Sequence, residues 1–133
     1  MEMISPDQEL FDYVYDASKK FGYDTYDYLP MASENAKYPF VEIGNVQQIN
    51  LPTKTALGAR FTISIHIWGN ARMRFEVSQM AERLCGLATH VLIGEHYRFV
   101  GRPDRTDKEI LNDTSVDNTV LKHGILTLVF DLG

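Results

Sequence analysis

The sequence predicts an α+β fold, in which two amphipathic helices cover a mostly antiparallel four-stranded sheet in the order α-β-β-α-β-β. Two observations predict it. Two segments repeat apolar residues at the three-to-four spacing of a helix, and four others alternate or concentrate β-forming residues. The chain has 133 residues, of which 44% are hydrophobic. That amount of apolar material predicts one core and a single domain, residues 1–133.

The first predicted element is a helix that starts after Ser5. Ser5 can cap the helix, and Pro6 fits its first turn. Gly22 is a natural end for this helix. One face carries the apolar residues Leu10, Val14, Ala17 and Phe21. Residues 23–38 then show no sustained period and predict an irregular connection with room for one short extended piece.

Two strands are predicted next. Residues 40–49 are rich in β-formers, and their alternation changes phase at Gly44-Asn45, which predicts a bulge. Residues 60–68 alternate more cleanly than any other segment. Their apolar face is Phe61, Ile63, Ile65 and Ile67. His66 belongs to the opposite face, where a helix-packed or surface histidine is expected rather than a metal ligand.

The second half of the chain predicts a helix and two strands. The helix runs from the cap residue Asn70 to about Leu84. Its apolar face is Met73, Val77, Met80, Ala81 and Leu84. A short apolar piece at 91–93, a strand at 96–100, a polar stretch at 101–118 and a last alternating strand at 121–132 follow.

Composition excludes several classes of function. The net charge of −5 argues against a protein that coats nucleic acid. The single cysteine, Cys85, allows no internal disulfide and no multi-cysteine metal site. The four histidines lie at no metal-ligand spacing, and no glycine-rich phosphate loop exists, so we expect no metal, cofactor or catalytic residue. No membrane span or signal peptide is seen, so synthesis in the cytoplasm is expected.

Three connections are longer than compact folding requires, at residues 23–38, 50–58 and 101–118. Either they become ordered against neighbouring subunits, or they are mobile loops. Five of the seven tyrosines also lie between Tyr13 and Tyr28, a density that suits an interface as well as a core. The predicted contact residues are Tyr26, Tyr28, Leu51, Pro52, Thr53, Lys54, Leu57, Arg102, Asp104, Arg105 and Asp107.

Several short motifs occur in a fixed order along the chain. They are Tyr38-Pro39-Phe40-Val41-Glu42-Ile43-Gly44, then Ile67-Trp68-Gly69, then Met80-Ala81-Glu82-Arg83-Leu84, and finally His123-Gly124-Ile125-Leu126-Thr127-Leu128. From residue 38 onward the chain resembles the tail-completion, or head-tail joining, proteins of long-tailed phages and prophages, in matching order and size.

The resemblance implies a structural role in the virion, at the head-tail junction. The expected partners are further copies of the chain in a ring, generally of six, together with the tail-tube protein and the head connector proteins. An isolated subunit is compatible with a monomer. No sequence-specific nucleic acid or membrane is expected as a partner. Three alternatives stay open: a head-side connector component, a non-phage α+β protein-binding module, and an unrecognised small enzyme.

Overall fold

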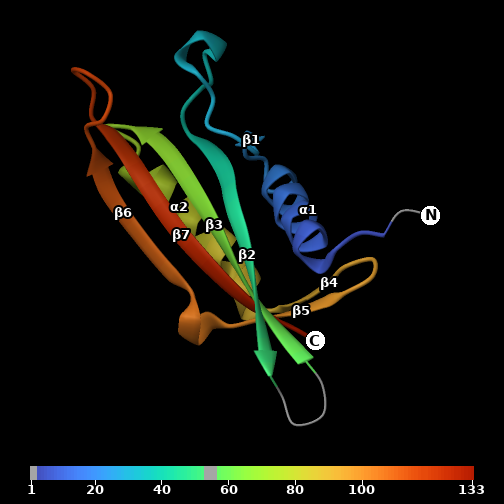
Figure 1. Cartoon of the computed structure of the whole chain (residues 1–133). Coiled ribbons are helices and arrows are strands. Elements are labelled where there is room, and N and C mark those ends of the chain that lie inside the picture. Colours follow the sequence, from blue (N-terminus) through green and yellow to red (C-terminus); the bar gives the residue numbers. More distant parts are fainter. Residues whose placement is uncertain (1–2, 53–56) are drawn as a thin grey trace.

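The computed structural model describes residues 3–52 and 57–133. Strands dominate it, and Figure 1 shows them as one long, curled sheet. The helices are α1 (Pro6–Lys20) and α2 (Arg74–Cys85), with short 3-10 turns at Ala32–Glu34, Gly86–Thr89 and Pro103–Arg105. The strands are β1 (Thr25–Tyr26), β2 (Phe40–Pro52), β3 (Leu57–Asn70), β4 (Val91–Ile93), β5 (Arg98–Gly101), β6 (Asp107–Asp113) and β7 (Leu121–Leu132).

The sheet has seven strands in the order β1-β2-β3-β7-β5-β4, and β6 pairs with β7 beside β5. The β1–β2 pair is parallel, whereas the other pairs are antiparallel. The predicted fold class, with its four-stranded sheet and α-β-β-α-β-β order, is therefore wrong. The structure instead has a mixed seven-stranded sheet with two short helices.

The missing strands are those whose sequence carries the weakest signal. β6 lies in the stretch that was predicted to be a polar connection, and Asp107, Lys108 and Glu109 are all exposed. Charged residues are typical of edge strands, which makes such strands look like loops in a sequence. β1 is only two residues long, and β4 only three, so no alternation can be recognised in them.

Both helices pack on one face of the sheet. Leu10 and Val14 of α1, and Val77 and Leu84 of α2, are fully buried in one core. The sheet side of that core is formed by Val41, Ile43, Phe61, Ile63, Ile65, Ile67, Leu126, Leu128 and Phe130. In Figure 1, α2 lies behind β3 and β7, while α1 lies beside β2. Among the residues that the structure describes, no helix lies on the opposite face, which we call the open face.

The sheet curls around α1. One end of α1 packs near β1 and β2, and Glu9 in its first turns receives hydrogen bonds from the backbone N–H groups of His96 and Tyr97, between β4 and β5. β2 and the turn between β4 and β5 come from opposite ends of the strand order, yet both contact α1. The curl follows from that shared contact.

Several predictions at the level of single elements are confirmed. α1 begins after Ser5 as predicted, and β7 has the predicted bounds. α2 lies in the predicted region, but its predicted cap is wrong: Asn70 still pairs with Leu121 as the last residue of β3, and the helix begins at Arg74 after the cap residue Met73. The register of β2 against β3 shifts between Ile43 and Val46, at the predicted bulge. The connection at 50–58 is shorter than predicted, because β2 and β3 stay paired as far as Pro52 and Leu57.

Candidate assembly surfaces

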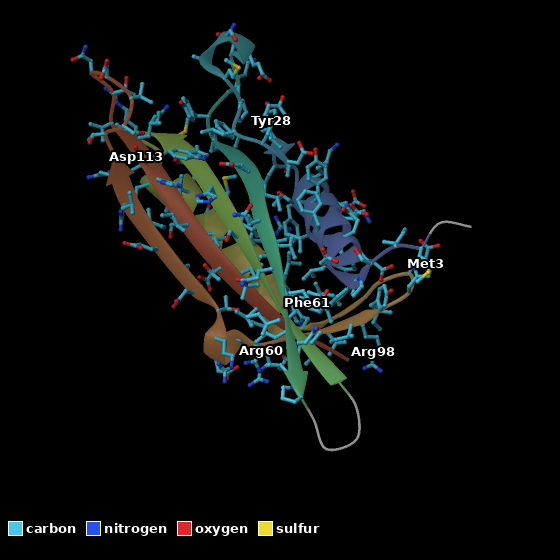
Figure 2. The ribbon with its side chains drawn as sticks, in the orientation of Figure 1. Met3, Tyr28, Arg60, Phe61, Arg98 and Asp113 are labelled. Atoms are coloured by element: carbon cyan, nitrogen blue, oxygen red, sulfur yellow. The ribbon has the colours of Figure 1, made fainter. Side chains whose placement is uncertain are left out.

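The predicted contact residues gather at two ends of the sheet. Tyr26 and Tyr28 lie near the end where the long connection before β2 projects, which we call the arm, residues 27–39. Figure 2 shows Tyr28 and Asp113 toward this end and Arg60 toward the other. At that other end, Leu51 and Pro52 finish β2, and Leu57 begins β3. Thr53 and Lys54 lie outside the described residues.

An apolar cleft lies at the arm end. It has a volume of about 370 Å³ and opens between the arm and residues 115 and 116 of the loop that joins β6 to β7, residues 114–120. Phe40, Trp68 and Leu121 form its wall on the sheet side. The large apolar side chains exposed at this end are Tyr28, Leu29, Met31, Tyr38, Val116 and Val120. Sequence reasoning predicted contacts for Tyr26 and Tyr28 here, but not this cleft.

Aromatic side chains stiffen the base of the arm. The ring of Tyr26 meets the rings of Tyr28 and Phe40 edge to face, with centroids 5.9 Å and 5.5 Å apart. Tyr38 stacks on Phe40 at 5.5 Å. The Tyr28 hydroxyl donates to Glu34 at 2.6 Å. Tyr26 is therefore a packing residue at the root of the arm, whereas Tyr28 is half exposed.

The opposite end carries an ion-pair network. Arg60 donates two hydrogen bonds to the Asp131 carboxylate, at 2.7 Å and 3.2 Å. Arg102 donates to the same carboxylate at 2.7 Å and twice to Asp104 at 3.2 Å. Arg105 lies 4.0 Å from Asp104. Three of the predicted contact residues, Arg102, Asp104 and Arg105, therefore lie together. Asp131 and Arg60, which the sequence did not indicate, connect them to the sheet.

This network fixes the charges that the surface presents. Hydrogen bonds from Arg60 and then from Arg102 outweigh the effect of burial and lower the pKa of Asp131. A hydrogen bond from Arg102 likewise lowers the pKa of Asp104. Both carboxyl groups therefore stay ionised at neutral pH, and the network holds the turn at 103–105 against β3 and β7. Asp107 follows directly as the exposed first residue of β6.

A histidine pair lies on the open face. His66 Nδ1 and His123 Nε2 are 2.8 Å apart, and His123 Nδ1 lies 3.2 Å from Asp113 Oδ2. The rings of Trp68 and His123 stack with their centroids 3.7 Å apart. The indole Nε1–H of Trp68 donates a hydrogen bond to Glu42 at 3.3 Å. Because an ionised Asp113 can only accept, His123 Nδ1 carries the proton and His66 donates to His123 Nε2.

The environment of His123 favours its neutral form. Burial lowers the pKa of His123, and the neighbouring His66 lowers it further, while Asp113 acts in the opposite direction. Hydrogen bonds from Ser115 lower the pKa of Asp113, which keeps that carboxylate charged. Sequence reasoning placed His66 on this face correctly but missed its partner, which lies 57 positions away. Only the register of β3 against β7 brings the two rings together.

The other candidate chemistry has a structural explanation. Cys85 is half-buried at the end of α2, and burial raises the pKa of its thiol, which disfavours a reactive thiolate. Among residues 3–52 and 57–133, no group of three His, Cys, Asp or Glu side chains is placed to hold a metal ion. Within the same residues, no helix is long and apolar enough to cross a membrane.

Proteins similar to this chain include a phage tail protein and a chain of a phage-like particle. The chain is 29% identical over 96 residues to the tail completion protein gp17 of Bacillus phage SPP1, a match that covers 71% of this chain and 68% of that protein. No family model matches the chain. A chain in the virion of a native gene transfer agent particle has the same fold, with a TM-score of 0.62, 17% identity and coverage of 93% and 94% of the two chains. The resemblance predicted from the sequence is confirmed by the first of these.

Proposed function

We propose that the chain is a structural component of a phage tail that completes the tail and joins it to the head. In this proposal, copies of the chain form a ring at the head-proximal end of the tail tube and contact the tail-tube protein below and the head connector proteins above. The observation that carries the proposal is the similarity to the SPP1 tail completion protein. The shared fold with a chain of a virion supports it independently of that sequence match.

The distribution of surface features also supports an assembly role. One end of the sheet exposes an apolar cleft and the apolar side chains around it, while the other end presents charges that the ion-pair network holds in place. A subunit of a ring needs different surfaces for its two neighbours and for the layers above and below. Exposed apolar clusters of this kind are typical of contact sites with other proteins.

The role is structural rather than catalytic. The SPP1 relative is a tail completion protein, and the polar clusters described above are engaged in internal hydrogen bonds and ion pairs. Similarity to a tail completion protein favours a tail component over a head-side connector component. We therefore assign the predicted contact residues, including Leu51, Pro52 and Asp107, to surfaces that meet other virion proteins.

Deletion of the gene from its parent phage tests the proposal. We expect filled heads and separate or unfinished tails in place of joined virions, because the tail end would lack the surface that meets the head. Electron microscopy of the lysate measures the fraction of joined particles. Supplying the intact gene in trans is the control and should restore joining. Joined, infectious virions in the deletion strain would refute the proposed function.

A further inference from the structure

The two outer strands of the central sheet each have an unpaired edge. Within the part of the chain that the structure describes, β2 beyond its bulge pairs only with β3, and β6 pairs only with β7. These edges lie on opposite sides of the run β2-β3-β7-β6, as Figure 1 shows. Each edge presents backbone N–H and C=O groups that another strand could bind.

The edge of β2 lacks the usual protection against such pairing. Residues 43–52 contain no charged side chain, and Gln47, Gln48, Ile49 and Asn50 are all exposed. Edge strands of monomeric proteins are normally protected by charges, by prolines within the strand, or by a covering segment. Here the only proline is Pro52, at the very end of the strand. A long, uncharged and uncovered edge is a binding site for another strand.

We propose that the β2 edge of one copy pairs with the β6 edge of the next copy, so that neighbouring sheets join into one continuous antiparallel sheet. The inference deepens the proposed function, on which it rests, by naming the contact between copies. Three observations support it: strand direction, the faces of the residues, and the position of each free edge along the sheet.

Strand direction fits this arrangement. The pairs β2–β3, β3–β7 and β7–β6 are all antiparallel, so the four strands alternate in direction and the two outer strands run oppositely. When a rotation brings the next copy alongside, its β2 therefore lies antiparallel to β6. The alternation continues from copy to copy without a break. A contact that uses two different edges is heterologous, the kind that closes into a ring.

The faces of the residues restrict the possible registers. Asp107, Glu109 and Leu111 pair with Thr127, Ile125 and His123, and so point to the open face. On β2 the open-face residues are Gln47, Ile49 and Leu51, which pair with Thr62, Arg60 and Gly58. A continuous sheet must pair open-face residues with one another. We place Glu109 opposite Ile49, which sets Asp107 opposite Leu51 and Leu111 opposite Gln47.

In this register, the offset between neighbouring copies gives a strand tilt close to that of a closed barrel. Asp107 is level with Ser64 through Thr127, and Leu51 is level with Gly58, six positions away along β3. Six residues along a strand span about 20 Å, and four neighbouring strands span about 19 Å across the sheet. Each copy is therefore shifted along the strand direction by about as much as its sheet is wide. That displacement tilts the strands by about 45° from the ring axis, close to the typical 35–45° of closed barrels.

The same offset keeps the neighbouring copy away from the first part of β2, before the bulge. There, β1 already pairs with Val41 and Glu42, which leaves no room for a neighbour's strand. A neighbour displaced by six positions avoids β1 and uses only the free half of the edge.

Cysteine cross-linking of the purified chain tests this pairing. Ile49→Cys and Glu109→Cys are made in separate chains that also carry Cys85→Ser, and the two chains are mixed and oxidised. Because a disulfide requires close Cβ atoms, we expect at least about tenfold more mixed dimer than from Gln48→Cys with Glu109→Cys, whose residues point to opposite faces. The double variant Ile49→Cys/Glu109→Cys should form a ladder of covalent oligomers. Oxidation traps even brief contacts, so a chain that is monomeric at equilibrium is still tested.

Circular dichroism and unfolding curves of each variant show whether it is folded before oxidation. Equal yields from the matched and mismatched mixtures, or no mixed dimer from either, would overturn the edge pairing. That result would leave the proposed function intact if deletion of the gene still prevented joining. Normal joining in the deletion strain, together with specific cross-linking, would instead overturn the function and leave the pairing between copies in place.

Discussion

Replacing Glu9 with glutamine is expected to lower the free energy of unfolding by about 2–3 kcal/mol at pH 7. The Glu9 carboxylate accepts hydrogen bonds from the backbone N–H groups of His96 and Tyr97, at 3.1 Å and 2.8 Å, and lies 2.8 Å from His96 Nδ1. Glu9 is only 7% exposed. Glutamine keeps one acceptor oxygen, and its NH₂ group would face a backbone donor that then has no partner.

The effect of this substitution depends on pH. Burial alone would raise the pKa of Glu9, but hydrogen bonds from His96 and Tyr97 outweigh burial and lower it. A lowered pKa in the folded state means that Glu9 stabilises the fold above its ordinary value of 4.5, and that this contribution is lost as the pH falls through the folded pKa. The stability difference between the two proteins should therefore shrink in acid.

Urea unfolding at pH 7 and in acid measures both effects. Asp16→Asn is the matched control, because Asp16 is an exposed carboxylate on the same helix and its replacement should change the free energy of unfolding by less than about 0.5 kcal/mol. If Glu9→Gln were as stable as Asp16→Asn at pH 7, the carboxylate would not connect α1 to the β4–β5 turn as described.

Replacing Phe99 with alanine is expected to lower the free energy of unfolding by about 3–5 kcal/mol. Phe99 is fully buried, and its ring meets that of Phe61 edge to face, with centroids 5.6 Å apart and planes at 83°. It lies on β5, opposite Leu132 of β7. Alanine would leave a cavity between β3 and β5 and remove the aromatic contact as well.

Phe75 provides a control of identical chemistry. It lies in the first turn of α2 and is 66% exposed, so Phe75→Ala should change stability by less than about 0.5 kcal/mol. Thermal and urea unfolding of the two variants give the comparison. Similar losses for both would contradict the placement of Phe99 in the core, and with it the packing of β5 against the helix side of the sheet.

The parts of the fold that could be predicted from the sequence are those whose burial is one-sided. The alternation of residues 60–68 identifies β3 because Ile63 and Ile65 are fully buried, while Thr62 and Ser64 on the open face are partly exposed. The helix before Gly22 was recognised for the same reason. In such segments the spacing of apolar residues shows directly which side chains are buried.

β6 could not be predicted, because its position depends on a partner rather than on its own composition. Only Ile110 packs against the core from this strand, and the three residues before it, Asp107, Lys108 and Glu109, are charged. β1 exists through parallel pairing with Val41 and Glu42, which no local pattern indicates. Because these strands were not recognised, only four strands were predicted, and the edge formed by β6 was missed.

The candidate contact residues were only partly predictable. The length of the connections pointed to Arg102 and Asp104 as contact residues, but their partners Arg60 and Asp131 lie on strands and join them only through the fold. The cleft at the arm end combines the arm with residues 115 and 116, which are distant in sequence. Contact roles for the predicted residues stay a prediction.

The most direct test of the assembly role is to locate the chain in particles. A copy of the gene with a short tag at the C-terminus is supplied to the deletion strain, and purified virions are examined by electron microscopy with a label against the tag. The account predicts label at the junction of head and tail in joined particles. Joined particles that carry no label there, with the tagged chain left in the soluble fraction, would contradict it.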